Sequence, residues 1–96
     1  MSMLVVVATV KAKPGKADAL RPVLKSLLAP TLAEAGCLRY EMNESEDGQS
    51  WMFVEQWESK TLWDRHMESP HLARFKAVAE DLVGHFELFS GAEVRS

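Results

Sequence analysis

The sequence predicts an α+β domain with the ferredoxin-like element order βαββαβ. Three observations predict it: a β-branched run near the amino terminus, two segments in which apolar residues recur every three or four positions, and two strand-like runs around a polar turn. In this fold a four-stranded antiparallel sheet carries both helical segments on one face. The 96 residues have the size of one domain, which we place at residues 1–96.

A strand and an amphipathic helix open the chain. Met3–Val10 is apolar at nearly every position, which predicts a strand whose two faces are both apolar. The turn signal Pro14-Gly15 follows, and apolar residues spaced by three and four then predict a helix over residues 16–35. We expect Pro30 to kink this helix and Gly36 to end it.

The second half of the chain predicts a hairpin, two further helical segments and a last strand. Asp47-Gly48 lies between two strand-like runs and is a strong signal for a two-residue hairpin turn. Ser69-Pro70 restarts a helix, because serine is a favoured N-cap and proline suits the first helical position. The elements expected here are strands at 37–44 and 51–58, helices at 59–68 and 69–84, and a strand at 85–94.

The hairpin turn decides which side chains share a face of the sheet. With a two-residue turn at Asp47-Gly48, the aromatic side chains collect on one face, which we expect to lie under the helices. Cys37 then lies on the opposite, more polar face. The helix-covered face is expected to carry three cross-strand pairs, namely Leu38–Trp57, Tyr40–Glu55 and Met42–Phe53.

Glu55 is the unusual residue on that face, because a carboxylate among aromatic side chains needs a hydrogen-bond donor or takes a raised pKa. The Tyr40 hydroxyl lies within cross-strand reach. His66, four residues after Leu62 on the inward stripe of its helix, is a second candidate partner. We therefore predict Glu55 and His66 as a general acid–base pair. The alternatives are a Glu55 that pairs with a lysine or arginine at the strand edge, and a His66 bonded to a backbone carbonyl.

The other histidines do not predict a metal site. His71 directly follows Pro70 and is expected in a solvent-facing first helical turn, with a contact to the pocket as the alternative. A step of five residues puts His66 and His71 on different helix faces, and His85 is distant in sequence. Cys37 has no predicted base beside it and is expected to be inert. We therefore expect no metal ligation.

Composition argues against several classes of partner. Lysine and arginine number 11 against 14 aspartates and glutamates, and the net charge of −3 provides no basic stripe for a nucleic acid. The longest apolar run, Met3–Val10, is shorter than the ~20 residues that cross a bilayer. One cysteine allows no internal disulfide, and the amino terminus lacks a secretory signal. We expect a cytoplasmic protein without nucleic-acid or membrane partners.

The first strand also predicts self-association. The helices of a ferredoxin-like fold cover one face of the sheet, yet residues 3–10 are apolar on both faces. A second copy of the chain is the simplest cover for the other face, because most small homo-oligomers are symmetric. We therefore predict a homodimer that packs sheet against sheet.

Three motifs resemble the antibiotic biosynthesis monooxygenase domain family. They are Gly36-Cys-Leu-Arg-Tyr-Glu41, Phe53-Val-Glu-Gln-Trp57 and His66-Met-Glu-Ser-Pro-His71. The resemblance extends over nearly the whole chain, and it implies a dimeric α/β barrel with a pocket between sheet and helices in each subunit.

The resemblance also implies an activity and roles for the motif residues. Several members of the family are cofactor-independent monooxygenases, which combine dioxygen with a quinol or a similar small aromatic molecule without flavin or metal. Under this interpretation His66 accepts or relays the phenolic proton and Glu55 orients it. The residues implied to contact the substrate are Tyr40, Phe53, Trp57, Phe75 and His71.

Two other functions stay open at this point. Another relative isomerises a phosphorylated pentane-dione, an activity that would need cationic groups at the pocket mouth; Arg39, Arg65 and Arg74 are the candidates. The remaining alternative is a non-catalytic, ligand-binding dimer whose polar core residues only stabilise the fold.

Overall fold

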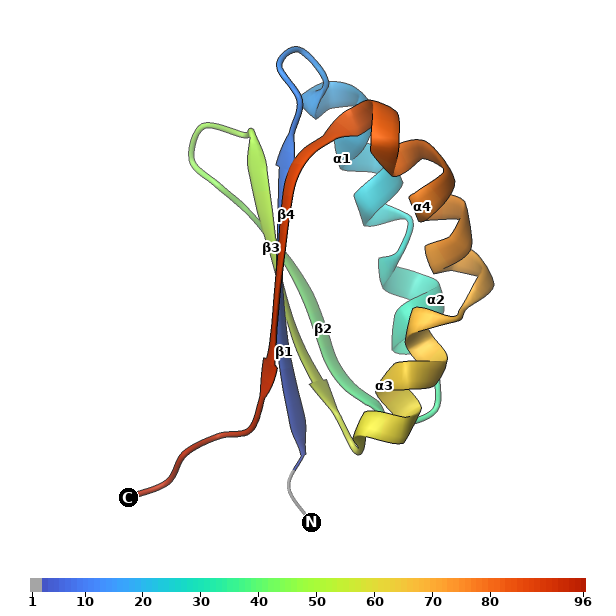
Figure 1. Ribbon diagram of the computed structural model, residues 1–96, viewed down its shortest axis with the longest axis vertical. Helices are drawn as coiled ribbons and strands as arrows, with labels where there is room; N and C mark the ends of the chain where they lie inside the picture. Colours follow the sequence, from blue (N-terminus) through green and yellow to red (C-terminus); the bar gives the residue numbers. More distant parts are fainter. Residues whose placement is uncertain (1–2) are drawn as a thin grey trace.

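The computed structural model describes residues 3–96 and has the predicted βαββαβ order, with each helical segment divided in two. Its strands form one antiparallel sheet in the order β2-β3-β1-β4. The helices of residues 3–96 cover one side of this sheet (Figure 1), and none is long and apolar enough to cross a membrane. The elements are β1 (Leu4–Ala12), α1 (Ala17–Lys25), α2 (Leu28–Leu32), β2 (Cys37–Glu44), β3 (Ser50–Trp57), α3 (Lys60–Met67), α4 (Pro70–Leu82) and β4 (Val83–Gly91).

The core lies between the sheet and the helices. Alternate residues of β1 are buried, among them Val6 and Val10, which are almost completely inaccessible to solvent. Leu20 and Leu24 of α1 are also buried, and Trp51 of β3 belongs to the same cluster. The predicted ferredoxin-like fold is therefore confirmed, with the helix-facing side of β1 as the centre of the core.

The first helical segment contains a break rather than a kink. α1 ends at Lys25 and α2 begins at Leu28, so the prediction of one helix over residues 16–35 is wrong. In a continuous helix, Pro30 could not donate to the Ser26 carbonyl, and the proline ring would clash with that carbonyl. The break comes one turn before Pro30 and removes both problems.

The hairpin keeps the predicted register but not the predicted turn. Tyr40 lies opposite Glu55, as the sequence predicts. The turn is longer than two residues, because the Ser45 N–H donates to the Ser50 carbonyl at 2.9 Å and residues 46–49 form the loop between them. The loop has an even number of residues, so the alternation of faces along both strands is preserved.

A bulge at the start of β2 changes the last predicted pair. Cys37 rather than Leu38 lies opposite Trp57, and the register shifts between Cys37 and Arg39. Cys37 therefore packs against the core, whereas Leu38 is 47% exposed. The prediction that Leu38 faces the helices and Cys37 the open side is wrong, because the extra residue of a bulge reverses the faces beyond it.

The open face of the sheet is apolar at its centre. Val7 of β1 lies between Val54 of β3 and Phe89 of β4, and Phe89 is 60% exposed. Met52, opposite Thr9 on the same face, is 46% exposed. These residues form an exposed apolar patch that the helices do not cover.

Gly36, between α2 and β2, allows a close contact with α3. Its φ of +83° lies in the left-handed region that favours glycine. A Cβ atom at this position would lie 2.3 Å from Cδ1 of Leu62 in α3. Glycine at position 36 therefore lets α3 approach the start of β2.

We expect Gly36→Ala to lower the free energy of unfolding by about 2 kcal/mol or more, because it adds left-handed strain and a clash with Leu62. Gly15→Ala is the matched control: its φ is +77°, but no atom lies within 4 Å of its Cβ position. The control should lose only about 1 kcal/mol. Urea unfolding measures both losses, and equal losses would contradict the steric argument.

Candidate active site

A cavity of about 80 Å³ lies between the sheet and the helices. Most of its wall is apolar, and the residues that line it include Leu27, Phe53, Trp63, Leu72 and Phe75. Phe86 and Leu88 of the edge strand β4 also line it and are about half exposed, so the cavity opens beside β4. The polar side chains in the wall are Tyr40, Glu55, His66 and Lys76. An apolar cavity with a few convergent polar groups is typical of a small-molecule site.

Glu55 lies in the middle of β3 and is 4% exposed. Its Oε1 accepts a hydrogen bond from the Trp57 indole N–H at 3.0 Å. Burial raises the pKa of Glu55 to about 7, the Trp57 hydrogen bond opposes this rise, and the charge of Glu34 adds to it. The alternative of a strand-edge ion pair is wrong, because the carboxylate is buried and bonded to an indole.

His66 lies in the last turn of α3 and is 2% exposed. Its Nδ1 lies 2.6 Å from Oε2 of Glu34, so the predicted Glu–His couple forms with Glu34 instead of Glu55. Burial lowers the pKa of His66, and the hydrogen bond to Glu34 opposes this effect. A neutral imidazole that donates from Nδ1 to a carboxylate keeps its Nε2 unprotonated, as a general base requires.

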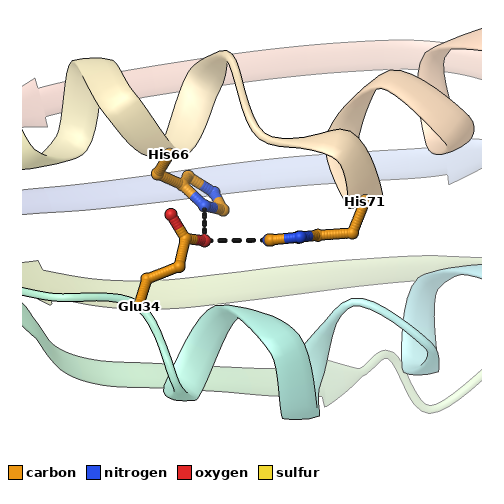
Figure 2. A group of neighbouring side chains, drawn as sticks. All are labelled: Glu34, His66 and His71. Atoms are coloured by element: carbon orange, nitrogen blue, oxygen red, sulfur yellow. Dashed lines mark hydrogen bonds and ion pairs between the residues drawn. The ribbon is translucent and has the colours of Figure 1, made fainter.

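His71, in the first turn of α4, joins the same carboxylate. Its Nε2 lies 2.8 Å from Oε2 of Glu34, and Figure 2 shows the two imidazoles converging on that oxygen. The helix break between Met67 and Pro70 makes this convergence possible, so the argument that the two histidines lie on different helix faces is wrong. His71 lines an outer groove with Arg74 rather than the cavity.

Glu34 is a site residue that the sequence does not predict. It lies in the turn after α2, two residues before Gly36, and its side chain is 18% exposed. Because Gly36 lets Leu62 approach, the next turn of α3 brings His66 to this carboxylate. The only signal in the sequence is a glutamate close to a helix-ending glycine, which is too common to single out.

Glu34, His66 and His71 are also the residues that a metal ion would use. One potential ligand atom of each lies within 4.8 Å of the others, and two histidines with a carboxylate are a known set for transition metals. Both nitrogens, however, contact the same carboxylate oxygen. The N···O distances of 2.6 Å and 2.8 Å are those of charge-assisted hydrogen bonds. Hydrogen bonding alone accounts for the observed arrangement.

Aromatic rings surround His66. The ring centroids of Trp57 and Tyr40 lie 4.8 Å and 5.6 Å from that of His66, and Tyr40 also contacts Phe53 at 5.4 Å. Burial and the charge of Glu55 raise the pKa of Tyr40, which keeps its phenol protonated. Trp57 is completely buried behind His66 and does not line the cavity, unlike Tyr40, Phe53 and Phe75.

Comparison with known proteins assigns the chain to a family. The family model for antibiotic biosynthesis monooxygenase matches residues 3–78, which is most of the chain. The chain belongs to this family. The matched region contains Glu34, both histidines that bind it, Glu55 and Lys76, so the family relation covers the polar residues of the site.

Individual relatives agree with the family assignment. The chain is 34% identical over 82 residues to "Putative monooxygenase Rv0793" of Mycobacterium tuberculosis, covering 85% of this chain and 81% of that protein. The crystal structure of PA3566 from Pseudomonas aeruginosa superposes with a TM-score of 0.94 at 32% identity, over 99% of this chain and 97% of that one. The structure of Rv0793 gives 0.90 at 30% identity, over 99% and 98%. Together they support a monooxygenase-like role.

Glu55 should make stability depend on pH. Because its folded pKa is raised from 4.5 to about 7, the stability due to its protonated form is full below about pH 4.5 and is lost as pH rises through about 7. The unfolding free energy of the natural protein relative to Glu55→Gln should therefore fall across this range, by up to about 3 kcal/mol. Chemical unfolding of both proteins at a series of pH values measures it. A difference that does not change with pH would contradict the buried carboxyl.

Proposed function

We propose that this protein is a cofactor-independent monooxygenase that acts on quinols or similar small phenols with dioxygen. The observation that carries the proposal is the arrangement around His66. Its Nδ1 bonds to Glu34, which leaves Nε2 free to act as a base, and the ring lines an apolar cavity walled by Phe53 and Phe75. Removing a phenolic proton makes the substrate electron-rich enough to reduce dioxygen itself.

The proposed reaction balances without an added reductant. His66 Nε2 accepts a phenolic proton from the hydroquinone, and the phenolate passes electrons to dioxygen. One oxygen atom replaces a ring hydrogen, the other leaves as water with two hydrogens, and the product is a hydroxyquinone. The ring supplies all four electrons, and the proton held by His66 returns to the reduced oxygen. Phe53 and Phe75 flank the ring, and Glu55 binds its second hydroxyl.

Oxygen uptake with a reduced quinone such as menadiol, corrected for spontaneous oxidation, tests this function. We expect His66→Ala to lower the enzyme-dependent rate at least tenfold, because the base is lost. His85→Ala is the matched control, since His85 lies on β4, contacts Glu87 and is exposed. Equal rates for the natural protein and His66→Ala would exclude His66 as the base.

We also propose that the protein is a homodimer in which two sheets pack against each other through their open faces. The support is the apolar patch around Val7, with Phe89 and Met52 exposed beside it. Apolar patches of this kind on a sheet are typical of interfaces between subunits. Such a dimer would cover the face that the helices leave open.

Sedimentation equilibrium at micromolar concentration tests the dimer. We expect the natural protein to sediment as a dimer, and Phe89→Glu to shift it toward monomer because a charge would be buried in the interface. Val78→Glu is the control, because Val78 is an exposed apolar residue of α4 on the helical side. A stable monomer of the natural protein would contradict the proposal.

A further inference from the structure

Lys76 is an exposed cationic residue that contributes to the wall of the mostly apolar cavity. It projects from α4, and its Nζ donates to the carbonyl of Met67 at 3.4 Å. Met67 directly follows His66 at the end of α3 and also lines the cavity. The ammonium group therefore lies at the end of α3, next to the residue that follows the proposed base. Burial lowers the pKa of His66, and the charge of Lys76 adds to this effect.

The arginines that an anionic ligand would otherwise use lie elsewhere. Arg39 pairs with Glu41 at 2.7 Å and lines a groove with Val54 and Phe89 on the open face of the sheet. Arg74 lines the outer groove beside His71. Within residues 3–96, Lys76 is thus the lysine or arginine that lines the cavity. The net charge of the chain is −3, so attraction for an anion must be local rather than a property of the whole surface.

The polar groups on β2 and β3 carry no positive charge. Glu55, on the central strand β3, brings a carboxyl that repels an anion when ionised. Tyr40, opposite Glu55 on β2, brings a protonated phenol. The cavity therefore has a neutral or acidic side at β2 and β3 and a cationic side at Lys76. A ligand with one charged end has a single favourable orientation in such a site.

We infer that Lys76 forms an anion subsite, in which its ammonium group binds a carboxylate or phenolate oxygen of an aromatic ligand next to His66. The inference deepens the proposed function: a phenolate formed by proton transfer to His66 gains a fixed positive charge beside it. It also assigns a substrate class, namely aromatic molecules whose anionic or ionisable oxygen points toward α4 while a neutral hydroxyl points toward Glu55. Lys76 determines specificity, and His66 performs the proton transfer.

A matched pair of probes tests the subsite without turnover. Binding of 2-naphthoate and 2-naphthol is measured by isothermal titration calorimetry under anaerobic conditions, at about pH 8, where the carboxylate is charged and the phenol is neutral. We expect Lys76→Gln to weaken naphthoate binding about tenfold and naphthol binding by less than about twofold, because a charge-assisted hydrogen bond is lost only for the anion. Lys76→Arg should retain most of the preference for naphthoate.

Lys25→Gln is the control, because it removes the same charge from the exposed end of α1. It should leave both affinities unchanged. The inference is overturned if Lys76→Gln weakens both probes equally, if it weakens neither, or if the natural protein binds neither probe. Oxygen uptake is measured separately. If the natural protein selects naphthoate through Lys76 but consumes no oxygen with quinols, the anion subsite is supported and the monooxygenase function is contradicted. If it consumes oxygen with quinols but does not select naphthoate through Lys76, only the anion subsite is contradicted.

Discussion

One carboxylate oxygen joins three segments of the helical layer of this protein. Oε2 of Glu34, in the turn after α2, bonds to His66 at the end of α3 and to His71 at the start of α4. Three segments that are separate in the sequence therefore meet at one atom (Figure 2). Because the site is largely buried, loss of the carboxylate would leave two imidazoles without their partner, at a cost of about 1–3 kcal/mol for each unsatisfied group.

The charge of the same carboxylate acts on two residues of the cavity wall, His66 and Glu55. Glu34 bonds to imidazole nitrogens, whereas Glu55 has one indole N–H and is more deeply buried. The charge of Glu34 adds to the effect of burial on Glu55, so the pKa of Glu55 rises to about 7. The Glu55 carboxyl therefore takes up a proton near neutral pH, a property typical of acid–base groups in enzymes. The buried imidazole of His66 stays neutral because burial opposes its protonation.

Sequence patterns predicted the features that depend on the spacing of apolar residues and on whether the hairpin loop has an even number of residues. The β-branched first strand, the Ser69-Pro70 helix start and the pairing of Tyr40 with Glu55 all follow from local rules, and the structure confirms them. Two features were not predicted: the β-bulge, which depends on one extra residue in β2, and the helix break, which depends on the missing N–H of Pro30. The bulge at Leu38 and the helix break before Pro30 leave the spacing of apolar residues nearly unchanged, so periodicity does not reveal them.

The sequence predicted only part of the candidate site, because patterns within one element do not show contacts between elements. His66 and Glu55 were found because each is a polar residue in an apolar pattern. Glu34 has no such pattern around it, and its role depends on the approach of α3 over Gly36, a tertiary contact. His71 was assigned to solvent because it directly follows Pro70 in the first turn of its helix, and that position does not show that Glu34 lies within hydrogen-bond distance. Contacts between elements, rather than patterns within them, complete the site.

We expect Glu34 to hold His66 as a neutral imidazole with its proton on Nδ1. The ¹⁵N chemical shifts and ¹⁵N–¹H couplings of the His66 ring at neutral pH test this, because they report which nitrogen is protonated. The natural protein should have a protonated Nδ1 and an unprotonated Nε2, and the preference for Nδ1 should be lost in Glu34→Ala. A proton on Nε2, or a fully protonated ring at neutral pH, would show that Glu34 does not set the state of His66.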